Sequence, residues 1–585
     1  MVLANRPETL LRVPCDDYNL SRSRVGLLRN RRKPEAVKLL ARRQFLKASL
    51  FGCGAAVANE IFGPPLIRRA RAESAARPIV ATSLGKLRGD FAEGVYSFKG
   101  VRYGATTAGM MRFLPPESPE SWNGVRDALQ IGPTAPQDRS RLPASTIGMP
   151  VPDLIGPGKM SEDCLVLNLW SPSLSGANRP VMVWLHGGGY TIGSSGAPMY
   201  DGANLAAKHG VVVVGVNHRL NVLGFLYLGG MGGEKYGDSG NAGMLDIVLA
   251  LRWIRDNVAQ FGGDPSNVTV FGQSGGGGKV STLMAMPAAK GLFHKAIVES
   301  GSELQVNTAD ESNEAAQKFL AHVGLRPSRL AELTEMPMEQ IIAGMHSMTN
   351  PDPMNVFGPV VDGRSLPRHP FDPNAPAISA GVPMIIGTTS TETTNLLGNA
   401  DPEAFSLSED QMRSKLKALL RPPDDSKLGA LIDAYRKDLP GASPSDIYVA
   451  VTTDKMVRMD AITQAERKAA QGAAPAYMYL FSWRTPVWGG KLRSPHGIEI
   501  PFVFENLSES KERIGTGANL QPLAEKVSGA WVAFARTGSP NHVGMPRWPA
   551  YTLKDRSTMI LDDQCTVVND PEKEARLVLS TLASA

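Results

Sequence analysis

The chain has 585 residues, of which 42% are hydrophobic and 20% charged, a composition typical of a globular protein. Its formal net charge is +6, but residues 1–72 hold fifteen Lys and Arg against five Asp and Glu, which leaves the remainder at −4. Because the basic charge belongs to the amino-terminal segment, we predict no nucleic-acid partner. Four cysteines in so long a chain exclude a disulfide framework, and no Cys/His group has metal-ligand spacing.

Residues 1–72 have the features of a cleaved export signal. Arg42 and Arg43 begin the run RRQFLK, which precedes a short apolar stretch and the small-residue sequence ARA at 70–72. This pattern resembles a twin-arginine signal, which would bring the protein through the twin-arginine (Tat) export machinery to the periplasm or out of the cell. A basic amphipathic segment is the alternative. No run of about 18 apolar residues occurs, so we predict no membrane span.

The rest of the chain alternates short apolar runs with longer helical patterns. The runs are nearly continuously apolar, as strands are when helices cover both faces of their sheet. They lie at residues 181–186, 211–217, 267–272, 295–300, 382–388 and 476–483. Residues 243–262 repeat apolar side chains every three to four positions and end in glycine, which predicts a helix. The alternation predicts an α/β fold with a large, mostly parallel sheet in one domain over residues 78–575.

The stretch FGQSGGGGKV, residues 271–280, places a serine between a predicted strand and a predicted helix. Gly272 and Gly276 flank Ser274 in the pattern G-x-S-x-G, which is typical of a tight turn that presents a nucleophilic serine. The alternatives are a Gly-rich turn or a phosphate-binding loop. A Walker-type loop is excluded because Lys279 is followed by Val280 rather than Ser or Thr. The remaining glycines, 277 and 278, have no role in this pattern, and close packing against a neighbouring strand is our hypothesis for them.

An earlier stretch, VWLHGGGY, follows a predicted strand with three glycines after His186. Glycines at this place let main-chain N–H groups approach a reacting carbonyl without interference from a Cβ atom. This is the HGGG type of oxyanion hole, and it precedes the serine turn in the expected chain order. The alternative is an ordinary glycine turn.

Together these motifs resemble the type-B carboxylesterases, the cholinesterase-like branch of the α/β-hydrolases that includes bacterial para-nitrobenzyl esterases. The resemblance implies an α/β-hydrolase fold, a small-molecule ester substrate and no cofactor. It extends over most of the body and is carried by the segments GKLRGDFAEGVYSFKGVRYG, RFLPPESPESWNGVRDA, SEDCLVLNLW, NHRLNVLGFL, NAGMLDIVLALRWIRDNVAQFGGDPSNVTVFGQSGGG and FARTGSPN through WPAY.

A serine nucleophile needs a histidine base and a carboxylate that orients the histidine, in the chain order Ser, Asp/Glu, His. His496, in SPHGIEIPFVF, matches the family segment HGxExPxVF, whereas His322, His346 and His542 have the surroundings of surface residues. For the acid, Glu392 follows a predicted strand in MIIGTTSTETTNLL. The family pattern there is GTNxxEG, and this chain has Thr389 and Thr393 in place of its Asn and Gly. Asp362 and Glu299 are weaker candidates.

The resemblance also assigns the N–H groups of Gly188, Gly189 and Gly275 as oxyanion donors and places Ser300 beside the triad. Family members usually carry Ala at the position of Gly275.

Two departures bear on the substrate. The usual partner of Cys164 is replaced by Ala135, so the usual bridge cannot form, and residues 135–164 contain no aromatic side chain for a quaternary ammonium. Choline esters are therefore poor candidates. Amide or carbamate hydrolysis with the same triad, and a catalytically silent binding protein like the neuroligin-like adhesion proteins, are the alternatives to ester hydrolysis.

Overall fold

The computed structural model describes residues 77–138, 155–348, 356–421 and 424–583. The predicted export signal lies outside these ranges. The described residues build a mixed sheet in which the strands lie side by side in the order β16, β15, β14, β13, β10, β9, β7, β8, β6, β4 and β3. Every neighbouring pair from β15 to β8 is parallel, while the pairs at the two edges are antiparallel.

The parallel strands contain all six predicted strands. The predicted strands are β7 (Arg179–Leu185), β8 (Val212–Val216), β9 (Gly263–Gln273), β10 (Lys295–Glu299), β13 (Met384–Thr389) and β14 (Ala476–Phe481). The parallel strand β15 (Ser557–Leu561) was not predicted. The antiparallel edges are β3 (Asp90–Ala92), β4 (Val95–Arg102), β6 (Val166–Ser171) and β16 (Thr566–Asn569). The predicted helix is α6 (Ala242–Asn257), continued by a 3-10 turn that ends at Gly262 in the left-handed conformation. The predicted α/β fold class is confirmed.

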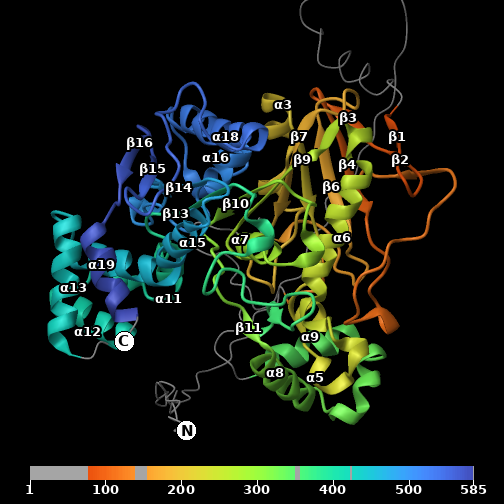
Figure 1. Cartoon of the computed structure of the whole chain (residues 1–585), viewed down its shortest axis with the longest axis horizontal. Coiled ribbons are helices and arrows are strands. Elements are labelled where there is room, and N and C mark those ends of the chain that lie inside the picture. The colour runs from red at the N-terminus through yellow and green to blue at the C-terminus, as the bar shows by residue number, and fades with distance from the viewer. Residues whose placement is uncertain (1–76, 139–154, 349–355, 422–423, 584–585) are drawn as a thin grey trace, which may run out of the picture. The chain divides into compact units, whose positions relative to one another are not determined.

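Side chains alternate between two cores along each central strand, which explains why the strands are apolar throughout. In β7, Val181 and Val183 enter one core and Met182 and Trp184 enter the other. The first core is covered by α6, α7 (Gly275–Leu283) and α15 (Met459–Ala470). The second is covered by α3 (Ala203–His209), α16 (Ile500–Phe504) and α18 (Leu520–Thr537), as the layers in Figure 1 illustrate.

Further helices interrupt the strand sequence, and the apolar runs did not predict them. Between β10 and β13 lie α8 (Ala309–His322) and α9 (Met338–Ser347), which pack together. Between β13 and β14 lie α11 (Thr394–Ala400), α12 (Glu409–Leu420), α13 (Asp425–Asp438) and α14 (Pro444–Thr453). The last three share a separate small core with α19 (Lys573–Ala583), visible beside the sheet in Figure 1.

Short elements complete the described chain. They are β1 (Ile79–Ala81), β2 (Lys86–Arg88) and β5 (Val125–Asp127) in a small sheet, the pair β11 (Asn307–Thr308) and β12 (Val360–Val361), and the helices α4 (Asn221–Phe225), α5 (Gly229–Gly232) and α17 (Lys511–Ile514). Cys164 and Cys565 are both buried and free. None of the helices in the described ranges has the length and hydropathy needed to cross a bilayer.

The turn between β9 and α7 is packed backbone to backbone against the end of β7. A Cβ atom added to Gly276 would lie 2.0 Å from the carbonyl oxygen of Leu185, and one added to Gly272 would lie 2.6 Å from it. The two glycines without a role in the motif are also tightly packed. An added Cβ would lie 2.9 Å from Gly301 Cα at Gly277, and 2.8 Å from Glu303 Oε2 at Gly278. The predicted packing against a neighbouring strand holds for Gly277, which lies against the end of β10, whereas Gly278 packs against the side chains of Glu303 and Tyr190 instead.

We predict that Gly276→Ala destabilises the protein by about 3 kcal/mol or more, because the methyl group would overlap a main-chain oxygen that has no room to move. Gly429→Ala is the matched control, since Gly429 lies within α13 with open space around its Cα. It should stabilise the protein by roughly 0.5–1 kcal/mol, the usual gain of Ala over Gly in a helix. Thermal unfolding followed by circular dichroism measures both. Equal shifts for the two variants would contradict the steric explanation.

Candidate active site

Ser274 lies at the tip of the turn, after the last residue of β9 and before the first residue of α7. Its backbone has φ 57° and ψ −128°, a conformation that residues other than glycine rarely adopt. The strain is held in place by the surrounding backbone: the Ser274 N–H donates to the Glu299 carbonyl of β10 at 2.8 Å. The side chain remains partly exposed. The sequence motif therefore folds as a strained turn that presents its serine.

His496 and Glu392 come from two loops that follow neighbouring strands. Glu392 follows β13 and is 2% exposed, and its Oε2 accepts a 2.5 Å hydrogen bond from His496 Nδ1. Its other oxygen, Oε1, accepts from the main-chain N–H of Thr389 at 2.7 Å. This second bond does not depend on the side chain at 389, so the absence of the family's Asn leaves the carboxylate fixed. Thr393, in place of the family's Gly, is buried and hydrogen-bonded to Thr452 at 2.7 Å.

The second ring nitrogen of His496 faces the serine turn. Because Nδ1–H donates to Glu392, Nε2 is an acceptor, and it lies 3.1 Å from the amide nitrogen of Gln273. Gln273 immediately precedes Ser274, so the imidazole is aimed at the turn and its acceptor nitrogen is occupied by a neutral amide. Sequence reasoning did not single out this glutamine, although its place beside the serine was a usable signal.

The glycine loop after β7 abuts the turn. A Cβ atom added to Gly187 would lie 3.4 Å from Ser274 Cβ, and one added to Gly275 would lie 2.2 Å from the Gly189 carbonyl oxygen. Gly188 and Gly189 have φ angles of 90° and 60°, which favour glycine. Gly275 is the first residue of α7, where N–H groups have no partner within the helix. The structure thus places the glycine loop against the serine turn, with Gly187 beside Ser274 and Gly189 beside Gly275.

Of the other candidate residues, Asp362 and His542 have their partners away from the Ser274 turn, whereas Glu299 and Ser300 lie at the end of β10, beside it. The Asp362 carboxylate accepts from Asn241 at 2.9 Å and from the main chain of its own loop. Glu299 is buried and accepts from the Trp531 indole at 2.7 Å. His542 contacts the Lys526 carbonyl at 3.0 Å. Ser300 follows β10, has φ 48°, and has a buried hydroxyl with no hydrogen-bond partner among the described residues.

Comparison with known proteins agrees with this geometry. Residues 76–579 match the model of the carboxylesterase family. The chain is 36% identical to a para-nitrobenzyl esterase of Bacillus subtilis over 507 residues, 85% of this chain and 97% of that protein. It is 34% identical to a phenmedipham hydrolase of Pseudarthrobacter oxydans, over 83% of this chain and 96% of that protein. The crystal structure of a carboxylesterase from Geobacillus stearothermophilus superposes with a TM-score of 0.74 at 36% identity, covering 86% of this chain and 100% of that one. The chain belongs to the carboxylesterase family.

This carboxylesterase has the α/β-hydrolase fold and is a serine ester hydrolase of type B, as the sequence resemblance implied. The match covers 97% of the Bacillus subtilis esterase and 100% of the Geobacillus stearothermophilus structure.

Two buried acids, Glu392 and Glu499, act on the pKa of His496. Burial lowers the pKa of His496, but the charge and the hydrogen bond of Glu392 outweigh burial and raise it above its usual 6.5. Burial and the nearby Glu499 raise the pKa of Glu299 to about 8, and burial and Glu392 raise the pKa of Glu499 to about 7. At neutral pH Glu299 is therefore mainly uncharged, and Glu392 is the carboxylate that directly supports the imidazole.

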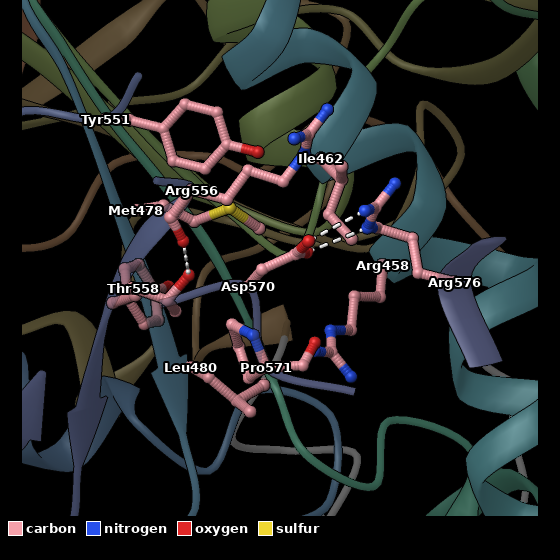
Figure 2. A pocket seen from close by; sticks show the side chains of 11 residues that line it. Arg458, Ile462, Met478, Leu480, Tyr551, Arg556, Thr558, Asp570, Pro571 and Arg576 are labelled. Atoms are coloured by element: carbon pink, nitrogen blue, oxygen red, sulfur yellow. Dashed lines mark hydrogen bonds and ion pairs between the residues drawn. The ribbon is translucent and has the colours of Figure 1, made fainter. Parts of the chain in front are cut away.

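Figure 2 shows a pocket of a different kind, between α15 and strands β14 and β15. Its three arginines are paired: Arg458 with Glu572, Arg556 with Glu466 at 2.8 Å, and Arg576 with Asp570 at 2.8 Å. The cavity has a volume of about 10 Å³, roughly the space of one water molecule. Its ion pairs hold the carboxyl-terminal segment in place. The cavity is too small for an ester substrate.

We predict that Glu392→Gln lowers kcat by on the order of 10³–10⁴-fold, because the amide cannot stabilise the imidazolium or fix its tautomer. In the wild-type enzyme, kcat/KM should fall as the pH drops through the raised pKa of His496. In the variant the charge and the hydrogen bond of Glu392 are lost, while burial and Arg513 still lower the pKa of His496 and Glu499 alone still raises it, so this acid limb should move to lower pH. A pH–rate profile with an ester substrate measures both effects. Asp362→Asn, the same chemical change at an alternative acid, should keep kcat within a few-fold, and an unmoved acid limb in Glu392→Gln would contradict the assignment.

Proposed function

We propose that Ser274, His496 and Glu392 form the catalytic triad of this carboxylesterase and that a carboxylic ester is cleaved through an acyl-enzyme at Ser274. The observation that carries the proposal is the 2.5 Å bond from His496 Nδ1 to the buried Glu392, with Nε2 aimed at the serine turn. A serine hydroxyl is a weak nucleophile, and a neutral imidazole supported by a carboxylate is the base that activates it.

In acylation, Ser274 Oγ attacks the ester carbonyl while His496 Nε2 takes the hydroxyl proton. For this transfer the Gln273 amide must give way to the serine hydroxyl at Nε2, since one lone pair serves both. The carbonyl oxygen becomes an oxyanion and accepts from the N–H groups of Gly188, Gly189 and Gly275, each donor lowering the barrier by about 3 kcal/mol. The imidazolium then protonates the leaving alcohol, and the acyl group remains on Ser274.

In deacylation, a water molecule takes the place of the alcohol. His496 removes its proton, the oxygen attacks the acyl carbonyl, and the same three donors hold the second oxyanion. Collapse returns the proton to Ser274 Oγ and releases the acid. All groups in this cycle belong to the chain, and the only other reactants are the ester and water.

We propose small-molecule carboxylic esters with aromatic or alkyl groups as the substrates. The similarity to a para-nitrobenzyl esterase, and to an esterase of Clostridium hathewayi described as hydrolysing aliphatic aromatic polyesters (34% identity, TM-score 0.73, 98% of that chain covered), supports uncharged esters. The lack of an aromatic side chain between residues 135 and 164 argues against choline esters.

We predict that Ser274→Ala lowers ester hydrolysis by at least about 10⁴-fold, since the residual rate would come only from binding and the oxyanion donors. Release of para-nitrophenol from short-chain para-nitrophenyl esters measures it. An organophosphonate should label the wild-type protein at Ser274 and leave the variant unlabelled. Full activity in the variant would overturn the mechanism.

The same assay separates the alternative functions. A parallel panel of amides and carbamates with matched acyl groups shows whether esters are the preferred class. Folded wild-type protein that neither hydrolyses esters nor takes up the phosphonate would identify a silent binding protein.

We further propose export by the twin-arginine machinery to the periplasm or the outside of the cell, supported by the RRQFLK motif and the ARA sequence at 70–72. In a bacterial host with this machinery, replacing Arg42 and Arg43 by lysine should retain the esterase in the cytosol with its leader intact, because the arginine pair is the recognised feature of the signal. Cell fractionation and amino-terminal sequencing measure this. Wild-type protein found only in the cytosol with its leader attached would refute the proposal.

A further inference from the structure

Lys279 is a lysine without solvent access in the first turns of α7, five residues after Ser274. Its ammonium donates to two main-chain carbonyls, those of His186 and Gly189, both at 2.9 Å. These two residues stand at the ends of the glycine loop after β7. One side chain from the serine helix therefore bridges to both ends of the loop that carries two of the oxyanion donors.

The carbonyls between these ends are held as well. The Gly187 carbonyl lies 2.9 Å from His186 Nδ1, and burial lowers the pKa of this histidine to about 3, so the ring is neutral and its Nδ1–H is the donor. The Gly188 carbonyl accepts from the N–H groups of Thr191 at 3.3 Å and Ile192 at 3.1 Å. Every carbonyl from 186 to 189 is thus fixed, two of them by Lys279.

Fixed carbonyls determine where the N–H groups point, because the C=O and N–H of a trans peptide unit are antiparallel. The Gly188 N–H belongs to the unit whose carbonyl His186 holds, and the Gly189 N–H belongs to the unit whose carbonyl Thr191 and Ile192 hold. Three successive glycines would otherwise sample many backbone conformations. Oxyanion donors lower the barrier only when they are oriented before the charge develops.

We propose that Lys279 is a positioning residue of the oxyanion hole, which fastens both ends of the glycine loop so that the Gly188 and Gly189 N–H groups face Ser274. This inference rests on the proposed triad and deepens it.

The surroundings of the ammonium support this role. Nζ lies 5.4 Å from the centre of the Tyr190 ring, and the Tyr190 hydroxyl donates to Glu303 at 3.2 Å. Gly278 leaves the space in which these two side chains meet, since an added Cβ there would lie 2.8 Å from both of their oxygens. Burial lowers the pKa of Lys279 to about 7. A neutral amine still has two N–H bonds, one for each carbonyl.

The test is Lys279→Met, which keeps an unbranched side chain of similar length and removes the donors. Ester hydrolysis should show a kcat on the order of 10- to 100-fold lower with KM within about threefold, a smaller loss than the 10²–10³ of deleting a donor outright. A trifluoromethyl ketone, whose carbonyl adds Ser274 Oγ and forms an oxyanion adduct, should bind weaker by the same factor as kcat/KM falls. Lys279→Gln, which can reach one carbonyl, should lie between wild type and Lys279→Met.

Rates are expressed per active site titrated with the organophosphonate, so misfolded protein does not enter the result. Lys468→Met is the matched control: Lys468 is also buried and donates to the carbonyls of Ser379 at 3.2 Å and Ala380 at 2.7 Å, outside the loop and the serine turn. Its kcat should stay within about twofold of wild type.

Three results would overturn the proposal: an unchanged kcat in Lys279→Met, an effect confined to KM, or loss of the acid limb of the pH–rate profile, which would make Lys279 a general base. Activity in Ser274→Ala would instead overturn the triad itself, so the two failures are distinguishable.

Discussion

The catalytic end of this carboxylesterase depends on one contact, the approach of the turn between β9 and α7 to the last carbonyl of β7. At Gly276 the two backbones are so close that a single added carbon atom would overlap the Leu185 oxygen. Because the glycine loop continues directly from β7, this contact also sets the loop against Ser274. Main-chain packing therefore brings the nucleophile and two of its proposed oxyanion donors together, and the Lys279 side chain then bonds to both ends of the loop.

The ionisable side chains of Glu392, Glu299 and Lys279, buried near this contact, are each either hydrogen-bonded or mainly uncharged at neutral pH. Each carboxylate oxygen of Glu392 accepts one hydrogen bond, from His496 Nδ1 and from the Thr389 N–H, and these two donors stabilise its negative charge. Glu299, in the same region, is mainly protonated at neutral pH because burial raises its pKa to about 8. Lys279, which lies in α7 after the serine turn, donates from Nζ to main-chain carbonyls rather than to a carboxylate.

The sequence made the sheet predictable because each central strand is buried on both faces and is apolar throughout, as in β7 and β10. The turn at Ser274 was predictable because a tight strand-to-helix turn needs small residues on both sides of the serine, which gives the recognisable pattern G-x-S-x-G. The helices between β10 and β14 were not predicted because only continuous apolar runs were followed there, and these helices are amphipathic, with short apolar faces that pack mainly on one another. The roles of Gln273 and Lys279 were also missed: one depends on a loop 223 residues away, and the other on main-chain carbonyls, which have no sequence signature.

The run of four glycines combines two opposing effects, a low helix propensity and close packing of α7 against its neighbours. Glycine in place of alanine costs a helix about 1 kcal/mol per residue, so Gly277 and Gly278 weaken the first turns of α7. An alanine at Gly277 would approach Gly301 Cα to 2.9 Å, and Gly301 in turn lies against the Ser274 carbonyl, where an added Cβ would come within 2.0 Å. The absence of side chains at these glycines thus lets the start of α7 pack directly against the backbone that follows β10. The bonds from Lys279 to the loop compensate for the helix propensity that these residues lack, because they tie the same weak turn to β7 through its loop.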